Sequence, residues 1–211
     1  MGMGVMIIGE SGSGKSYSMR NLNPKEVGVF AVEKPRLPFP EGKNFQIAKN
    51  ATYNMIMKAF TAPKLKRYVI DDSQYLLVNE MFDRATETGY GKFTEMALHF
   101  RNLIHYVNHN MPDDVIVYFL HHPEIDTNTS KAKAKTIGKM LDEKLTVEGC
   151  FDIVLFCKIE NGEHVFITQS DGTTTAKSPL GMFPDRMPND LKQVDEAIRK
   201  YYGMNEEDNN D

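Results

Sequence analysis

The feature that most constrains the fold is a run of eight residues near the start of the chain. Residues 9–16 read Gly-Glu-Ser-Gly-Ser-Gly-Lys-Ser, which matches the phosphate-loop pattern G-x-x-x-x-G-K-[ST] in full. A short apolar run at residues 4–8 precedes it, and helix-compatible sequence continues to Leu22. This order of strand, glycine-rich loop and helix is the context that gives the pattern its meaning.

Each part of such a loop has a distinct task in binding a phosphate chain. The glycines let backbone N–H groups point inward, and the N-terminus of the following helix adds a partial positive charge. Lys15 would reach the β- and γ-phosphates of ATP, and the Ser16 hydroxyl would ligate Mg²⁺. The expected nucleotide-binding residues are Gly9, Glu10, Ser11, Gly12, Ser13, Gly14, Lys15, Ser16 and Tyr17.

Apolar strands that alternate with helices predict an α/β fold. Buried strands are expected at residues 4–8, 27–32, 68–71 and 115–120. The clearest helix spans residues 92–110, where apolar residues recur at helical spacing. A hairpin is expected at 153–168, and a last helix is expected to be capped by Asn189 and to stop at Gly203. The pattern predicts a mainly parallel sheet covered by helices on both faces, with an antiparallel C-terminal hairpin.

Length and charge indicate one domain with an acidic tail. The 211 residues suit a single core, which we place at residues 1–203. Residues 204–211 carry four acidic and no basic side chains, so the net charge of −4 hides a neutral body and a tail that is expected to be disordered. Without a secretory signal or an apolar span, and with only Cys150 and Cys157 as cysteines, the chain is expected to be cytoplasmic and away from membranes.

Polar residues follow several of the predicted strands at the edge that should also carry the phosphate loop. Asp71 is a candidate Mg²⁺ ligand, whereas Asp72 is either a second ligand or a helix cap. Glu33 could orient a water for attack on the γ-phosphate, or could be a solvated loop residue. His121 and His122 could sense the γ-phosphate, and the sequence does not choose between them.

A lysine-rich stretch after these histidines is a candidate nucleic-acid contact. Its basic residues could bind the backbone of single-stranded DNA without sequence preference, although a solvated lysine run reads the same way. Tyr90, in a Gly-Tyr-Gly loop, could stack on a base. The lysines in question are Lys131, Lys133, Lys135 and Lys139.

The chain resembles the RecA-type P-loop ATPases, and more narrowly the small phage-encoded RecA-like ATPases associated with single-strand annealing recombination. Five segments carry the resemblance, and together they span most of the body. These segments are residues 9–16, 29–33 (Val-Phe-Ala-Val-Glu), 68–73 (Tyr-Val-Ile-Asp-Asp-Ser), 119–122 (Phe-Leu-His-His) and 171–179 (Asp-Gly-Thr-Thr-Thr-Ala-Lys-Ser-Pro).

The resemblance implies a RecA-like P-loop NTPase core with specific roles for these residues. Glu33 falls where the family has its catalytic glutamate, Asp71 matches the Mg²⁺-site aspartate, and His121-His122 replaces the polar sensor. Related ATPases insert a basic residue into the nucleotide site of a neighbouring subunit, for which Lys177 is the candidate and Arg186 the alternative. A homo-oligomer acting on single-stranded DNA, with a single-strand-binding or annealing protein as partner, is therefore expected.

Two other classes of function share the same loop. A small-molecule or nucleotide kinase has the loop and a similar size, but residues 127–139 contain lysines where such a kinase usually carries an arginine-rich lid. A nucleotide-dependent switch or adaptor would bind ATP to load a partner and hardly turn it over. If the chain is phage-encoded, its expected location is the cytoplasm of the host cell.

Overall fold

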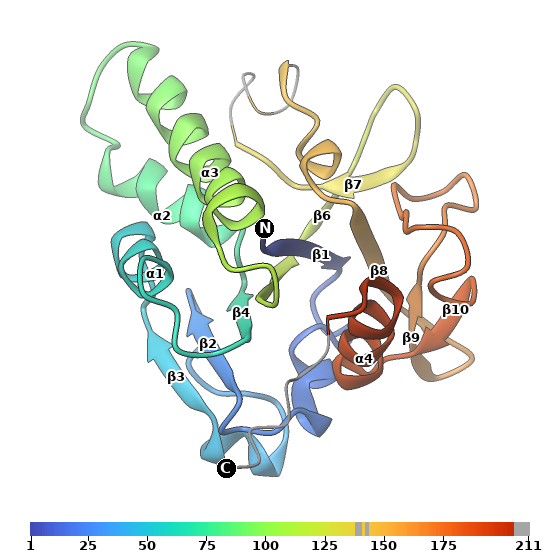
Figure 1. Cartoon of the computed structure of the whole chain (residues 1–211). Coiled ribbons are helices and arrows are strands. Elements are labelled where there is room, and N and C mark those ends of the chain that lie inside the picture. The colour runs from blue at the N-terminus through green and yellow to red at the C-terminus, as the bar shows by residue number, and fades with distance from the viewer. Residues whose placement is uncertain (138–140, 142–143, 205–211) are drawn as a thin grey trace.

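Strands alternate with helices along the chain, as Figure 1 shows for this computed structural model, which describes residues 1–137, 141 and 144–204. The strands are β1 (Met3–Gly9), β2 (Val27–Ala31), β3 (Gln46–Lys49), β4 (Arg67–Asp71), β5 (Ile116–His121), β6 (Pro123–Ile125), β7 (Ala132–Ala134), β8 (Ile153–Glu160), β9 (Glu163–Ile167) and β10 (Arg186–Pro188). The α-helices are α1 (Tyr53–Phe60), α2 (Tyr75–Asp83), α3 (Gly91–Asn110) and α4 (Leu191–Tyr202), and the 3₁₀ helices are η1 (Ser16–Asn21), η2 (Pro40–Asn44) and η4 (Val147–Cys150).

An eight-stranded sheet in the order β10-β9-β8-β1-β5-β4-β2-β3 organises the molecule. The strands from β8 to β3 are parallel, and β9 pairs antiparallel with both β8 and β10. A separate two-stranded sheet joins β6 to β7. This confirms the predicted fold class, a mainly parallel α/β sheet with an antiparallel C-terminal hairpin.

Alternating side chains of the central strands build a core on each face of the sheet. Met6, Ile70 and Phe119 pack with α1, α2 and α3 on one face, whereas Ile7 and Val69 pack with η1 and α4 on the other. Both faces are covered in Figure 1, as parallel strands with continuous apolar runs require. Six apolar residues of α3 predicted to point inward, from Met96 to Val107, are buried.

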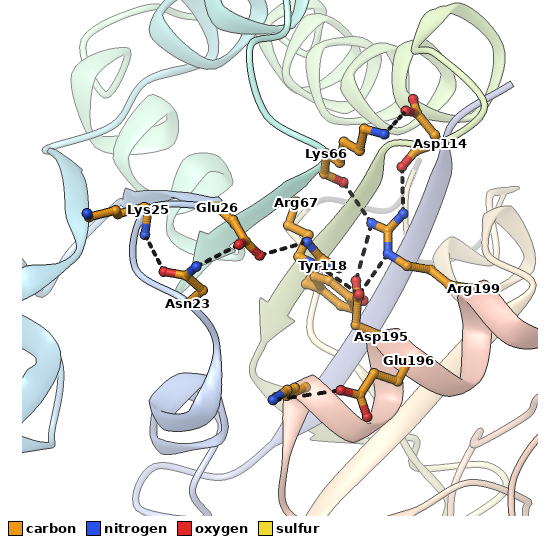
Figure 2. A network of polar contacts seen from close by, with 11 residues as sticks. Asn23, Lys25, Glu26, Lys66, Arg67, Asp114, Tyr118, Asp195, Glu196 and Arg199 are labelled. Carbon is orange, nitrogen blue, oxygen red and sulfur yellow. Dashed lines mark hydrogen bonds and ion pairs between the residues drawn. The ribbon is translucent and has the colours of Figure 1, made fainter. Parts of the chain in front are cut away.

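A buried polar network fastens α4 to the sheet, as Figure 2 shows. Asp195 is 1% exposed and accepts hydrogen bonds from Arg67, Arg199 and Tyr118, each at 2.8 Å. Arg199 also donates to the backbone carbonyl of Asp114 at 3.0 Å. Because every charged member has an opposite charge or an acceptor beside it, the network can lie under the helix without an isolated buried charge.

The segment after the phosphate loop differs from the expected helix. It forms a 3₁₀ helix of six residues, and Leu22 is its C-cap. The Ser18 hydroxyl donates to the Lys15 carbonyl at 2.6 Å, a local bond of the kind that competes with regular helix, and Pro24 blocks extension. The partial charge of a long helix dipole is therefore smaller here than expected.

One expectation about the ends of α4 is wrong by one residue, and the other is confirmed. Asp190 caps the helix through a hydrogen bond from the Lys192 amide, whereas Asn189 is turned toward the phosphate loop. Gly203 ends the helix with a positive φ of 64°, as predicted. The short edge strands β3 and β10 and the β6–β7 sheet were not predicted, because their sequences lack a sustained apolar period.

Three smaller observations complete the fold. Within the described residues, no helix combines the length and apolar character needed to cross a membrane. Both cysteines are free, and Cys157 is buried while Cys150 is half-buried. Residues 138–140, 142 and 143 lie outside the described residues, and so does Lys139 among the predicted DNA-binding lysines; the acidic residues of 205–211 lie outside them as well.

Candidate functional site

The carboxyl ends of three neighbouring strands bring most of the predicted site residues to one edge of the sheet. β1 ends at Gly9, β5 ends at His121 and β4 ends at Asp71. Strand β5 lies between the other two, and all three are parallel, so their ends share an edge. This edge is where ligands bind in open α/β sheets.

The phosphate loop, residues 10–15, has unpaired N–H groups that suit an anion. Gly12 and Gly14 take positive φ angles of 82° and 104°, which favour glycine. Among the described residues, no acceptor takes a hydrogen bond from the backbone N–H of Gly12, Gly14 or Lys15. The Ser13 hydroxyl is also buried without a partner. Unsatisfied donors converging in a glycine-rich loop form an anion-binding concavity, which fits a nucleotide phosphate chain.

Lys15, Ser16 and Asp71 are in contact range across the edge. The Lys15 ammonium folds back over the loop and donates to the carbonyls of Gly9 at 2.7 Å and Glu10 at 3.1 Å. The Ser16 hydroxyl donates to Asp71 Oδ1 at 2.8 Å. A hydroxyl and a carboxylate held together beside the loop are hard oxygen ligands of the kind Mg²⁺ prefers.

The charges at this edge perturb one another. Burial and the neighbouring Asp72 raise the pKa of Asp71 to about 6, against the opposing effects of Ser16 and Lys15. Burial also lowers the pKa of Lys15, although the nearby aspartates counteract it. For Asp72, burial acts upward, but the hydrogen bond and charge of His122 outweigh it and lower the pKa. A divalent cation would relieve the repulsion between the two carboxylates.

The carbonyl of Ser13 is held by residues that sequence reasoning missed. His164 on β9 donates to it through Nδ1 at 2.6 Å, and Cys157 on β8 donates through Sγ at 3.0 Å. Asn189 in turn donates to Cys157 Sγ at 2.9 Å. These contacts dock the C-terminal hairpin against the phosphate loop, and no local sequence signal announces them because they depend on the hairpin register.

The two histidines occupy different positions. His121 is fully buried, and burial lowers its pKa to about 4, so it is neutral. Its Nε2 lies 2.7 Å from the Lys135 carbonyl and must carry the proton, and its Nδ1 lies 2.9 Å from the Ser73 hydroxyl, which is also 3.0 Å from the Leu120 carbonyl. His122 is at the surface of the site, with Nε2 3.1 Å from Asp72 Oδ1. Of His121 and His122, only His122 lines the pocket beside the phosphate loop.

That pocket has a volume of about 350 Å³ and includes two cations that the sequence analysis did not single out. Lys34 and Arg36 line it together with Lys15, Ser16 and Asp71. Lys34 follows Glu33 directly and Arg36 comes two residues later, in a loop whose path across the sheet has no local sequence signal. Glu33 itself is exposed and lines an adjacent hollow with residues of α1 and α2. The structure thus places Glu33 near this edge but outside the wall of the phosphate-loop pocket.

The three predicted DNA-contacting lysines that the structure describes, Lys131, Lys133 and Lys135, lie on and beside the β6–β7 sheet. Lys135 is exposed, and Lys131 is half-buried. Lys133 forms ion pairs at 3.5 Å with Glu124 and Asp126, so part of the positive charge is neutralised. The Lys135 amide donates to the His122 carbonyl at 2.9 Å, which ties this sheet to the nucleotide edge.

The remaining predicted residues lie apart from the phosphate loop. Tyr90 is 89% exposed at the end of a turn that Arg84 holds through Glu87 and Glu95. Lys177 pairs its backbone with Val154, near the start of β8 and away from the loop of its own chain. Arg186 is exposed on β10, 3.2 Å from Glu160. Their contribution to a neighbouring subunit stays a prediction.

Comparison with known families decides the superfamily. A family model described as AAA domain matches residues 1–180, which covers the phosphate loop and every strand up to β9. The chain belongs to the AAA domain family. Among curated proteins, none matches the sequence closely enough to count as a relative. As an AAA domain, the chain is of the nucleotide-binding ATPase type, in agreement with the phosphate-loop prediction.

Proposed function

We propose that this AAA domain is a Mg²⁺-dependent ATPase that acts on single-stranded DNA in phage recombination or replication. The observation that carries the ATPase part is the 2.8 Å contact of Ser16 with Asp71 beside unpaired loop amides and Lys15. Ser16 and Asp71 would hold the metal, which supplies charge neutralisation to the phosphates. The loop amides and Lys15 bind and orient the phosphate chain in this scheme.

The test is phosphate release from ATP with and without Mg²⁺, using Lys15→Ala and, as control, the exposed Lys25→Ala. We expect turnover that needs Mg²⁺, is lost in Lys15→Ala and is retained in Lys25→Ala. Hydrolysis that persists in Lys15→Ala would refute the site. Transfer of phosphate to a small molecule instead of water would support a kinase in place of an ATPase.

The DNA part of the proposal is supported by the resemblance to phage annealing-type ATPases and by the tie between Lys135 and the two histidines. We propose a homo-oligomer with nucleotide between subunits, Lys177 or Arg186 acting on the neighbour, and a single-strand-binding or annealing protein as partner. Single-stranded DNA should stimulate turnover and bind at low salt. Neither stimulation nor binding would refute this part while leaving the ATPase intact.

A second candidate is a nucleotide-dependent switch with little turnover. The position of Glu33 outside the phosphate-loop pocket favours it, because a residue that activates water must reach the terminal phosphate. The rate of ATP turnover by the Glu33→Gln variant distinguishes the ATPase from the nucleotide-dependent switch. Loss of turnover with unchanged ATP binding supports hydrolysis through Glu33, whereas slow turnover unaffected by the substitution supports the switch.

A further inference from the structure

The segment between β2 and η2 crosses the nucleotide edge, and we call residues 33–39 the strap. It leaves β2, whose last residue Ala31 pairs with Asp71. It reaches the phosphate-loop side at Phe39, which is buried and whose ring lies 6.3 Å from that of Tyr17. Pro35 and Pro38 restrict the backbone between these two anchors. The strap is therefore held at both ends and stiffened in the middle.

Two cations of the strap face the pocket without partners of their own. Lys34 and Arg36 are exposed and line the same pocket as the phosphate loop. Within the described part of the chain, neither makes a hydrogen bond or ion pair. Lys34 is close enough to Asp72 to help lower the pKa of that carboxyl. Lys15, the other cation that lines the pocket, already donates to the carbonyls of Gly9 and Glu10.

The place at which the strap leaves the sheet indicates which end of a bound nucleotide it would contact. The loop after β1 would bind the phosphate chain of a nucleotide, and Ser16 and Asp71 would hold Mg²⁺, which would neutralise part of the phosphate charge. Strand β2 lies beside β4 on the side away from β1. The strap thus begins on the side of Asp71 that is away from β1, where a terminal phosphate would extend.

Charge balance points the same way. If the strap is left out, the side chains that line the pocket include one cation, Lys15, and two carboxylates, Asp71 and Asp72. The imidazoles of His122 and His164 also line it. With Lys34 and Arg36 it has three cations, which suits a triphosphate that Mg²⁺ neutralises only in part. The planar guanidinium of Arg36 can donate two parallel hydrogen bonds to phosphate oxygens, and Lys34 acts as a point charge.

We propose that Lys34 and Arg36 bind the γ-phosphate from within the same chain, so that the pocket distinguishes ATP from ADP. This inference rests on the proposed nucleotide-binding function. It assigns to the strap a charge that related ATPases take from a neighbouring subunit. The strap therefore acts as a specificity element for the triphosphate, in addition to the loop that binds both nucleotides.

The experiment measures, by calorimetry with Mg²⁺, the affinities of ADP and of a non-hydrolysable ATP analogue. The variants are Lys34→Ala, Arg36→Ala and the double substitution. Lys43→Ala is the matched control, because Lys43 is exposed on η2 and does not line the pocket. We expect the double variant to bind the ATP analogue at least about tenfold more weakly, with ADP within about twofold, since charge-assisted hydrogen bonds to one phosphate are lost. Arg36→Lys should recover only part of the loss.

The reference variant Lys15→Ala separates failure of this inference from failure of the proposed function. If the unaltered protein binds neither nucleotide, or if Lys15→Ala binds both normally, the proposed function falls and the inference with it. If binding depends on Lys15 but the double strap variant retains its preference for the ATP analogue, only the inference is overturned. Weaker binding of single-stranded oligonucleotide with unchanged nucleotide affinities would also overturn it and would assign the cations to DNA.

Discussion

The contact between Gly14 and His164 shows how little room the phosphate loop leaves. A Cβ atom at Gly14 would lie 2.8 Å from His164 Nδ1, and the φ of 104° is strained for any other residue. Gly12 has a positive φ of 82° but nothing within 4 Å of a Cβ. Gly14→Ala should therefore weaken nucleotide binding by about tenfold more than Gly12→Ala, since only the first adds displacement of His164 to a backbone cost of about 1–2 kcal/mol.

The double variant Gly14→Ala/His164→Ala tests the cause. Removing the imidazole frees the space but also removes the hydrogen bond to the Ser13 carbonyl. If the clash is the cause, affinity in the double variant should exceed that expected from adding the two single effects. Calorimetric titration with ADP measures all four proteins, and strictly additive losses would contradict the proposed clash.

His121 and Asp71 should affect stability in opposite directions as pH falls. Burial holds the pKa of His121 at about 4 in the native state against an ordinary 6.5, so the unfolded chain binds a proton first. Stability from neutral His121 is thus lost as pH falls from 6.5 toward 4. Asp71 has a native pKa of about 6 against an ordinary 3.8, so its protonation in the native state restores stability as pH falls through 6.

Chemical denaturation at pH 7.5 and pH 5 in chelator separates these two effects. His121→Gln removes the loss of stability that His121 causes at low pH. The free energy of unfolding of this variant, relative to that of the unaltered protein, should therefore rise by about 2 kcal/mol between pH 7.5 and pH 5. Asp71→Asn removes the second, so its relative stability should decline over the same interval. Equal pH dependence in His121→Gln and the unaltered protein would show that His121 titrates normally.

At the scale of elements, the packing of α4 depends on Asp195 more than on its helical propensity. Asp195 receives Arg67, Arg199 and Tyr118 beneath the helix, as Figure 2 shows. Asp195→Ala leaves two guanidinium groups without their shared carboxylate, so we expect the free energy of unfolding to fall by about 3–5 kcal/mol. Lys192→Ala breaks only the exposed 3.8 Å pair with Glu196 and should cost about 0.5 kcal/mol or less.

Urea denaturation followed by circular dichroism measures these differences. Tyr118→Phe gives an intermediate case, because it removes one hydrogen bond and leaves both ion pairs; a loss of about 1 kcal/mol is expected. A loss as small in Asp195→Ala as in Lys192→Ala would show that the buried charges reorganise and that apolar contacts alone hold α4.

The elements that the sequence predicted correctly are those with long apolar periods. The buried face of α3 and the strands β1, β4 and β5 follow from spacing alone, because burial on both sides of a parallel sheet demands continuous apolar runs. The cap of α4 was misplaced by one residue, since Asn189 and Asp190 are equally good caps in isolation. The choice between them depends on Cys157, distant in sequence, because its sulfur accepts a hydrogen bond from the Asn189 side-chain amide.

At the scale of the whole molecule, the sheet order explains which site residues could be predicted. Lys15, Ser16 and Asp71 follow from a loop motif and a strand end, and parallel strands bring such ends to one edge. His164, Lys34 and Arg36 could not be found in this way. Their place in the pocket depends on the hairpin register and on the path of the strap across the sheet, which no local pattern encodes.

The charge distribution leads to a prediction about the acidic residues at 204–211. Tyr202 and Met204, at the end of α4, line a common hollow with Gly149 and Cys150 of η4. η4 contacts β7 through Glu148, which accepts from the Ala134 amide at 2.7 Å. Four carboxylates attached at this point can compete with DNA for Lys131 and Lys135. Deleting residues 204–211 should tighten binding of a single-stranded oligonucleotide by about threefold to tenfold at low salt. At low salt the charges of the tail are screened least and compete best.

Fluorescence anisotropy of a labelled oligonucleotide across a salt series measures these affinities. The control for the length of the tail is a full-length variant whose acidic side chains are replaced by the matching amides, at Glu206, Glu207, Asp208 and Asp211. If charge is the cause, the deletion and the neutral variant should match, and their advantage should vanish near 0.5 M salt as screening removes the competition. Because Lys133 is already paired with Glu124 and Asp126, Lys133→Ala should change the affinity less than Lys135→Ala. Equal affinities of the full chain and the deletion variant at low salt would show that residues 204–211 do not compete for DNA.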